Sequence, residues 1–150
     1  MRDRINAALK QAMRDRDKTR LATLRLINAA IKDRDIAVRS DGNMDGIPDE
    51  AILAVMAKMV KQRHDSAKIY EEAGRLELAE QERGEIAVIE DFLPKQLSDD
   101  EIQKAVQKAI TDTGAGSIRD MGRVMGALKS SYAGQMDFGK AGGAVKEMLG

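Results

Sequence analysis

Apolar residues recur every three or four positions along most of the chain, a spacing that predicts a series of amphipathic α-helices. Ile5, Leu9 and Met13 form the first such stripe and predict a helix over residues 3–16. The same period predicts three more helices in the first two thirds of the chain, over residues 17–39, 48–73 and 75–94. No segment shows the alternation of period two that is typical of strands. The pattern therefore predicts an all-α protein.

Residues at the predicted helix ends support these boundaries. Asp17 is placed to cap the second helix, and Pro48 stands where a first helical turn accepts proline. Gly74 is expected to end the third helix in the left-handed conformation. The fourth helix is expected to bury Leu78 and Leu93 and to continue to Pro94.

The stretch LPKQLSDDE, which starts at Leu93, reads as a joint between two domains. Pro94 stops one helix, and Ser98 with Glu101 has the S-x-x-E spacing of a capping box that starts the next. We expect an N-terminal domain of about four helices over residues 1–97 and a small three-helix domain over residues 98–150. The helices of the second domain are predicted to span 98–114 and to begin again at Ser117 and Asp137.

The last two predicted helices carry glycines beside their apolar stripes. Their core stripes are expected to contain Met121, Val124, Met125, Leu128, Phe138, Ala141, Val145, Met148 and Leu149. Glycine in a helix interior costs roughly 1 kcal/mol relative to alanine, so this arrangement needs a reason. One hypothesis is a bare strip rimmed by cations on which a sugar-phosphate backbone rests; the other is close packing of helix on helix. The candidate contacts for nucleic acid are Arg119, Gly122, Arg123, Gly126, Lys129, Gly134, Lys140 and Lys146.

Charge is balanced overall and uneven along the chain. The 25 basic and 25 acidic residues give a formal net charge of zero, which does not by itself imply a nucleic-acid partner. Residues 1–39 hold 11 Lys and Arg against 5 Asp and Glu, whereas residues 40–97 hold 7 against 13. Packing of oppositely charged helices explains this division. A secondary basic surface is expected at Arg20, Arg25, Lys32 and Arg63.

Other chemistry finds little support in the sequence. Without cysteine the chain has no disulfide or thiol nucleophile, and without an apolar leader or membrane span it is expected to be cytoplasmic. The run DGNMDG matches the start of a calcium loop, but Ile52 occupies the position that needs a bidentate glutamate. His64, Asp65 and Ser66 are adjacent on a helix and so cannot form a relay by themselves. We therefore expect no catalytic residue, metal or cofactor in this chain.

Four runs in register resemble one family. DMGRVMGALKSSYAGQMDFGKAGGAVKEML resembles the C-terminal part of the GatB/YqeY domain family, and VKQRHDS, EEAGRLELAEQE and LPKQLSDDEI resemble its free-standing YqeY-like members. The resemblance covers the whole chain and implies two helical domains. It also implies that the second domain is similar to the tail of the B subunit of the amidotransferase that makes Gln-tRNA(Gln), a tail that helps hold tRNA. Two residues depart from the pattern of the family. In the C-terminal run Gln135 stands where many relatives have a basic residue, and in VKQRHDS His64 stands where an arginine is common.

The resemblance implies a tRNA-associated accessory protein without catalysis of its own. Its implied partners are tRNA and a protein of tRNA synthesis or amide transfer. The chain is too short to hold the glutaminase or kinase part of an amidotransferase, and it has no phosphate-binding G-x-x-x-x-G-K motif. Two alternatives stay open: a protein-interaction module whose methionine-rich tail grips a partner helix, or a subunit that supports amide transfer only in a complex.

Overall fold

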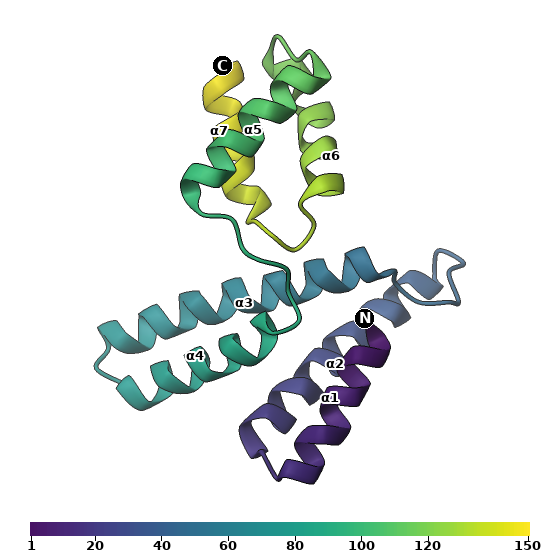
Figure 1. Cartoon of the computed structure of the whole chain (residues 1–150), viewed down its shortest axis with the longest axis vertical. Coiled ribbons are helices and arrows are strands. Elements are labelled where there is room, and N and C mark those ends of the chain that lie inside the picture. Colours follow the sequence, from purple (N-terminus) through teal and green to yellow (C-terminus); the bar gives the residue numbers. More distant parts are fainter. The chain divides into compact units, whose positions relative to one another are not determined.

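The structure is a computed structural model that describes residues 1–150, and it confirms the all-α prediction (Figure 1). The elements in chain order are α1 (Arg2–Asp15), α2 (Lys18–Arg39), α3 (Asp49–Glu72), α4 (Leu76–Glu90), α5 (Asp99–Thr113), the 3-10 helix η1 (Ile118–Asp120), α6 (Met121–Ser131) and α7 (Phe138–Leu149). Two compact units divide the chain, Met1–Leu93 and Pro94–Gly150. No helix combines the length and apolar composition that crossing a bilayer requires.

The first unit contains two helical hairpins, α1–α2 and α3–α4, which pack together through α2 and α4. Each hairpin contributes one apolar stripe to a shared core. The fully buried large side chains of this core are Ile5, Leu24, Ile27, Ile52, Met56 and Ile89. Because the core is built almost without aromatic residues, it depends on aliphatic and methionine side chains that interlock between helices.

Polar contacts of Asp35 tie the α1–α2 hairpin together and hold the loop that follows it. Arg2 on α1 donates two hydrogen bonds to the carboxylate of Asp35 on α2, at 2.7 and 2.8 Å. Asp35 also accepts the Ile47 N–H at 2.8 Å, which fixes the loop before α3. This loop passes so close that a Cβ on Gly46 would stand 2.7 Å from Asp35 Oδ1, and Gly46 has a φ of +88°. Glycine is therefore required at this position.

The end of α4 is held by arginines from the other hairpin. Arg4 and Arg20 lie over the Phe92 ring, with guanidinium carbons 5.2 and 6.0 Å from its centroid. Arg4 also donates to the Asp91 carbonyl oxygen, and Arg20 pairs with the Asp91 carboxylate at 2.9 Å. These contacts fasten the C-terminal end of α4 to both α1 and α2.

The second unit is formed by α5, α6 and α7, each of which contacts the other two. Its core is led by Val106, Val124, Leu128 and Val145, which are fully buried. Ser98 and Glu101 form the predicted capping box at the start of α5. The segment before α5 belongs to this unit, because the Leu97 N–H donates to the Gln135 carbonyl oxygen at 2.8 Å.

Several predicted boundaries and faces differ from the structure. Helix α4 ends at Glu90 and not at Pro94, because the chain turns where the arginines hold Phe92. A 3-10 turn follows Ser117, so that α6 begins only at Met121. Leu78 and Met148 were expected in the core, yet each is 38 % exposed, because no other helix covers them. The caps at Asp17, Ser98 and Asp137 and the left-handed Gly74 are as predicted.

Arg16 ends α1 in the left-handed conformation, with a φ of +55°, and no other residue besides glycine has a positive φ. We expect Arg16→Gly to raise the free energy of unfolding by about 0.5 to 1 kcal/mol, because glycine removes the Cβ strain at this cap. Urea denaturation followed by circular dichroism measures the change. Arg14→Gly, inside the same helix, is the control and is expected to lower stability by about 1 kcal/mol. A loss of stability in Arg16→Gly would contradict this account.

The contacts of Asp35 predict an acid-sensitive component of stability. Hydrogen bonds from Arg2 and from the Ile47 N–H lower the pKa of Asp35 from 3.8 to about 2. A depressed carboxyl pKa stabilises the fold above the unfolded-state value and loses that stabilisation as pH falls from 3.8 toward 2. Wild type is therefore expected to lose more stability than Asp35→Asn over this range. Urea denaturation of both proteins at pH 7, 4 and 2.5 tests the difference, and parallel losses would refute it.

Candidate nucleic-acid interface

Helix α6 presents two glycines to open space. Gly122 and Gly126 are exposed, and a Cβ added at either would meet no atom within 4 Å. Lys129, one turn further along, is exposed and makes no ion pair. These three residues form what we call the α6 strip. Packing within the unit therefore gives no reason for glycine in the α6 strip.

Helix α7 uses its glycines in two different ways. Gly142 is buried, and a Cβ there would stand 3.5 Å from Met121 Cε and 3.9 Å from Met125 Cε. These are ordinary van der Waals distances, so Gly142 packs against α6, but the packing would also admit an alanine. Gly143 is exposed, with nothing within 4 Å of an added Cβ. Gly139, Gly143 and Lys146 are exposed on that side of the helix, and we call them the α7 strip; Glu147, one turn beyond Gly143, is exposed there as well.

The α6 and α7 strips lie on one face of the second unit. Each residue of an α-helix is turned by about 100° from the one before it. Met121 and Met125 mark the side of α6 that faces α7, and the α6 strip lies one step further from the core. Gly142 marks the corresponding side of α7, with the α7 strip beyond it. Because the two helices run antiparallel (Figure 1), both strips turn to the face opposite α5.

The cations of the predicted site divide into two groups. Lys129, Lys146 and Arg119 are exposed and make no ion pair. Arg123 pairs with Asp120 at 2.9 Å, and Lys140 lies 3.7 Å from the Asp99 carboxylate. Both cations are largely exposed to solvent, so a phosphate can compete for them at small cost.

Aspartate carboxylates accept backbone N–H groups just before α6 and at the start of α7. Asp120 accepts the N–H groups of Gly116 and Ser117, at 3.0 and 3.3 Å, in addition to Arg123. These hydrogen bonds, led by that of Gly116, lower the pKa of Asp120. At α7 the Asp137 side chain accepts the Gly139 N–H at 2.8 Å. This role of Asp120 was not predicted, although its spacing from Ser117 has the pattern of a capping box.

Gly134 lies in the α6–α7 loop and is buried, so it does not present bare backbone to a ligand. Its φ of +74° turns the chain between the two helices. Its carbonyl oxygen accepts the Gln96 side-chain amide at 2.6 Å, which anchors the loop to the segment before α5. The role of Gly134 is therefore to set the course of the loop between α6 and α7. Gln135, next to it, is half-buried.

The secondary basic surface is divided in the structure. Arg20 is engaged by Asp91 and Phe92, as described above. Arg63 pairs with Glu85 at 2.9 Å and also donates to the Met59 carbonyl oxygen, with its side chain only 15 % exposed. Only Arg25 and Lys32, both on α2, are exposed without an ion pair.

The two other motifs singled out in the sequence have ordinary structural roles. In the DGNMDG loop the Asn43 amide oxygen accepts the Asp45 N–H, and its nitrogen donates to the Gly46 carbonyl oxygen. This is an Asx turn that orders the loop without an ion. No group of three or more histidine or acidic side chains is placed to hold a metal ion. His64 is exposed on α3.

Comparison with known proteins gives one family match and one relative that cover nearly the full length of the chain, and a second relative that covers about two thirds of it. The profile of the Yqey-like protein family matches residues 2–149. The Altered inheritance of mitochondria protein 41, mitochondrial, of Pyrenophora tritici-repentis is 27 % identical over 98 % of this chain and 80 % of its own length. The protein of the same name from Kluyveromyces lactis is 31 % identical over 69 % of this chain and 55 % of its own length. The chain belongs to the family of YqeY-like proteins.

Proposed function

We propose that this protein is an accessory RNA-binding protein whose second unit holds the sugar-phosphate backbone of tRNA on the face formed by the α6 and α7 strips. Sequence resemblance to the tail of the tRNA-dependent amidotransferase motivates the choice of tRNA as the RNA class. The contact is non-catalytic in this chain, and it positions RNA for another protein. Lys129 and Lys146 supply the charge, while the glycines supply close access.

The observation that carries the proposal is the open space beside Gly122, Gly126 and Gly143. Each glycine costs roughly 1 kcal/mol of helix stability relative to alanine, and none is needed to pack the unit. A ligand that contacts the helix backbone directly would explain these glycines. Because glycine has no side chain, the atoms of the ligand can approach the main chain closely. Gly142 is in contact with α6, whereas an added Cβ at any of these three residues would meet no atom within 4 Å.

The charges on the same face favour a polyanionic ligand. Lys129 and Lys146 belong to different helices and flank the glycines, and Arg119 adds a third unpaired cation near the start of α6. Contacts of this kind read phosphate and sugar and carry little sequence information. Since the unit has nearly as many acidic as basic residues, we expect moderate affinity with a clear dependence on salt.

The lysines give the first test of the proposal. We expect Lys129→Glu/Lys146→Glu to weaken binding of labelled total tRNA by at least about tenfold, because two phosphate contacts become repulsive. The slope of log affinity against log salt is expected to fall by about two. Fluorescence anisotropy at several salt concentrations measures both.

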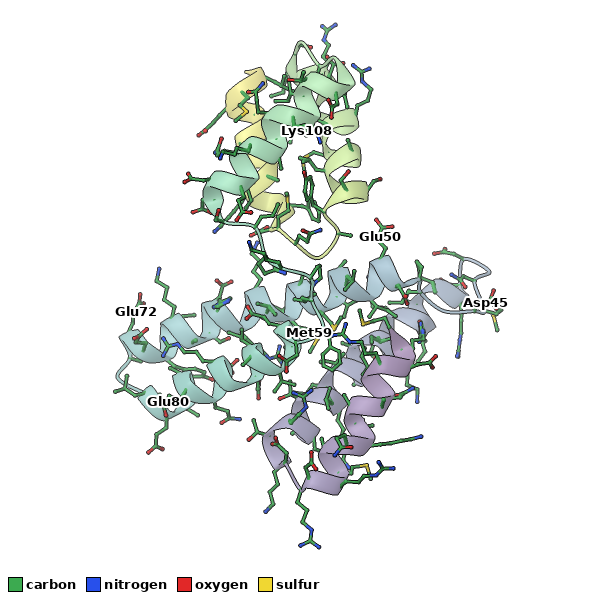
Figure 2. All side chains as sticks on the ribbon, in the orientation of Figure 1. Asp45, Glu50, Met59, Glu72, Glu80 and Lys108 are labelled. Atoms are coloured by element: carbon green, nitrogen blue, oxygen red, sulfur yellow. The ribbon has the colours of Figure 1, made fainter.

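The matched control is Lys104→Glu/Lys108→Glu, which changes the charge of the same unit by the same amount. Both lysines are exposed on α5, on the opposite face, and Lys108 is labelled in Figure 2. Equal losses of tRNA affinity in the two double variants would indicate a non-specific effect of net charge and reject this face as the binding site. Absence of tRNA binding by wild type at low salt would reject RNA altogether and direct attention to a protein ligand.

The glycines give a second test with two readouts of opposite sign. Gly126→Ala and Gly143→Ala are each expected to stabilise the protein by about 1 kcal/mol, because alanine favours the helix and meets no neighbour. The same substitutions are expected to weaken tRNA binding severalfold by holding the backbone away from the ligand.

Gly84→Ala on α4 provides the comparison for the glycine variants, since it too meets nothing within 4 Å. It is expected to give the gain in stability without the loss of binding. Denaturant midpoints and tRNA anisotropy on the same samples separate the two effects. Gain of stability with unchanged tRNA affinity in all three variants would exclude close approach to the backbone.

A further inference from the structure

The free end of the α3–α4 hairpin carries exposed aliphatic side chains. Ile69 and Leu76 are 63 % and 61 % exposed, and Leu78 is 38 % exposed. The five residues from Gly74 to Leu78 line an open concavity of about 470 Å³ at this end. We call the segment from residue 66 to residue 82 the hairpin tip. Neither the core of the first unit nor the proposed RNA face uses these side chains.

The exposed face of the tip continues a face that is buried elsewhere. Leu78, Glu85 and Ile89 lie on one side of α4, because intervals of seven and eleven residues return a helix to nearly the same angle. Ile89 is fully buried in the shared core. Within the first unit α3 and α4 extend beyond α1 and α2 (Figure 1), so that the same side is open at Leu78. The tip therefore lacks the third helix that covers the hairpin nearer its base.

Ion pairs keep the open end of the hairpin in shape. Arg63 on α3 and Glu85 on α4 pair at 2.9 Å, and both side chains are nearly buried. Nearer the turn, Arg83 pairs with Glu71 at 2.8 Å. At the turn itself the Arg75 N–H donates to the Tyr70 carbonyl oxygen, five residues back, and Gly74 is left-handed. The surface is thus formed before any ligand arrives, which lowers the entropic cost of binding.

The tip has a net negative charge. Its five glutamates outnumber its two cations, Lys68 and Arg75. Glu72, Glu77 and Glu80 are exposed and make no ion pair, and Figure 2 shows Glu72 and Glu80 at this end of the hairpin. Phosphates are repelled by such a surface, whereas lysine and arginine side chains are attracted to it. Apolar side chains within an acidic rim complement a ligand that is itself apolar and basic.

We propose that the hairpin tip is a docking site for a basic amphipathic helix of a partner protein. A helix of this kind needs only a few apolar anchors, at intervals of three, four and seven residues, and its basic flanks match the glutamates. Three exposed aliphatic side chains are too few for a stable dimer of this chain, which needs about 800 Å² from each partner. The site is independent of the proposed RNA face.

A model peptide tests the chemistry of the tip directly. The probe is a labelled synthetic helix of leucine and lysine with leucines at helical spacing; its counterpart has glutamate in place of lysine. In fluorescence anisotropy the full chain is expected to bind the lysine peptide and not the glutamate peptide. Leu76→Ser/Leu78→Ser is expected to weaken that binding by about tenfold or more. Leu26→Ser/Ile36→Ser, at equally exposed sites on α2, is expected to leave it unchanged.

Two outcomes of the binding and sedimentation experiments would overturn the proposal. One is equal binding of the lysine peptide by wild type and both double variants, each checked for folding by circular dichroism. The other is self-association of wild type in sedimentation that the tip variant abolishes, because the occupant would then be a second copy of this chain. Amide resonances of wild type titrated with the peptide are expected to shift within residues 66–82, and shifts confined to other residues would also reject the site.

Discussion

A pair of antiparallel helices has two faces, and in each unit of this structure a further helix covers only one of them. The rest of the structure depends on this constraint. In the second unit α5 covers one face of the α6–α7 pair and buries Val124, Leu128 and Val145. The opposite face carries exposed glycines and lysines together with Glu147. In the first unit α2 covers the base of the α3–α4 hairpin at Ile89 and ends before the tip. Both candidate binding surfaces are thus the uncovered sides of helix pairs whose other sides form the core.

The sequence predicted best those features that depend on a few neighbouring residues. Asp17 caps α2, and Ser98 with Glu101 caps α5, because a side chain and a backbone N–H three residues apart complete each motif. The end of α4 and the exposure of Leu78 depend instead on how far a neighbouring helix extends and on where Arg4 and Arg20 meet Phe92. Periodicity places Leu78 on the correct side of the helix but contains no information about what lies opposite.

The same limit applied to the candidate RNA site. Helical spacing was sufficient to group the glycines and lysines of α6 and α7 into strips. It could not separate Gly142, which packs on two methionines, from Gly143, which faces solvent, because that difference arises from the contact of α7 with α6. Nor could it show that Arg63 is engaged with Glu85, twenty-two residues further along the chain. Residue type indicates what a side chain can bind, and tertiary structure decides whether it is already bound.

Charge separates the two uncovered surfaces by the ligands they can accept. The α6 and α7 strips combine bare backbone with unpaired lysines, an arrangement suited to a polyanion that approaches the main chain. The hairpin tip combines exposed leucines with unpaired glutamates, an arrangement suited to a cationic helix. Since neither ligand is attracted to the other surface, the two proposed ligands would not compete for the same site. A chain whose formal charge is zero can thus have one surface that favours anions and another that favours cations. Salt screens charges over about 10 Å, so a ligand responds to the charges near its own site and not to the net charge of the chain.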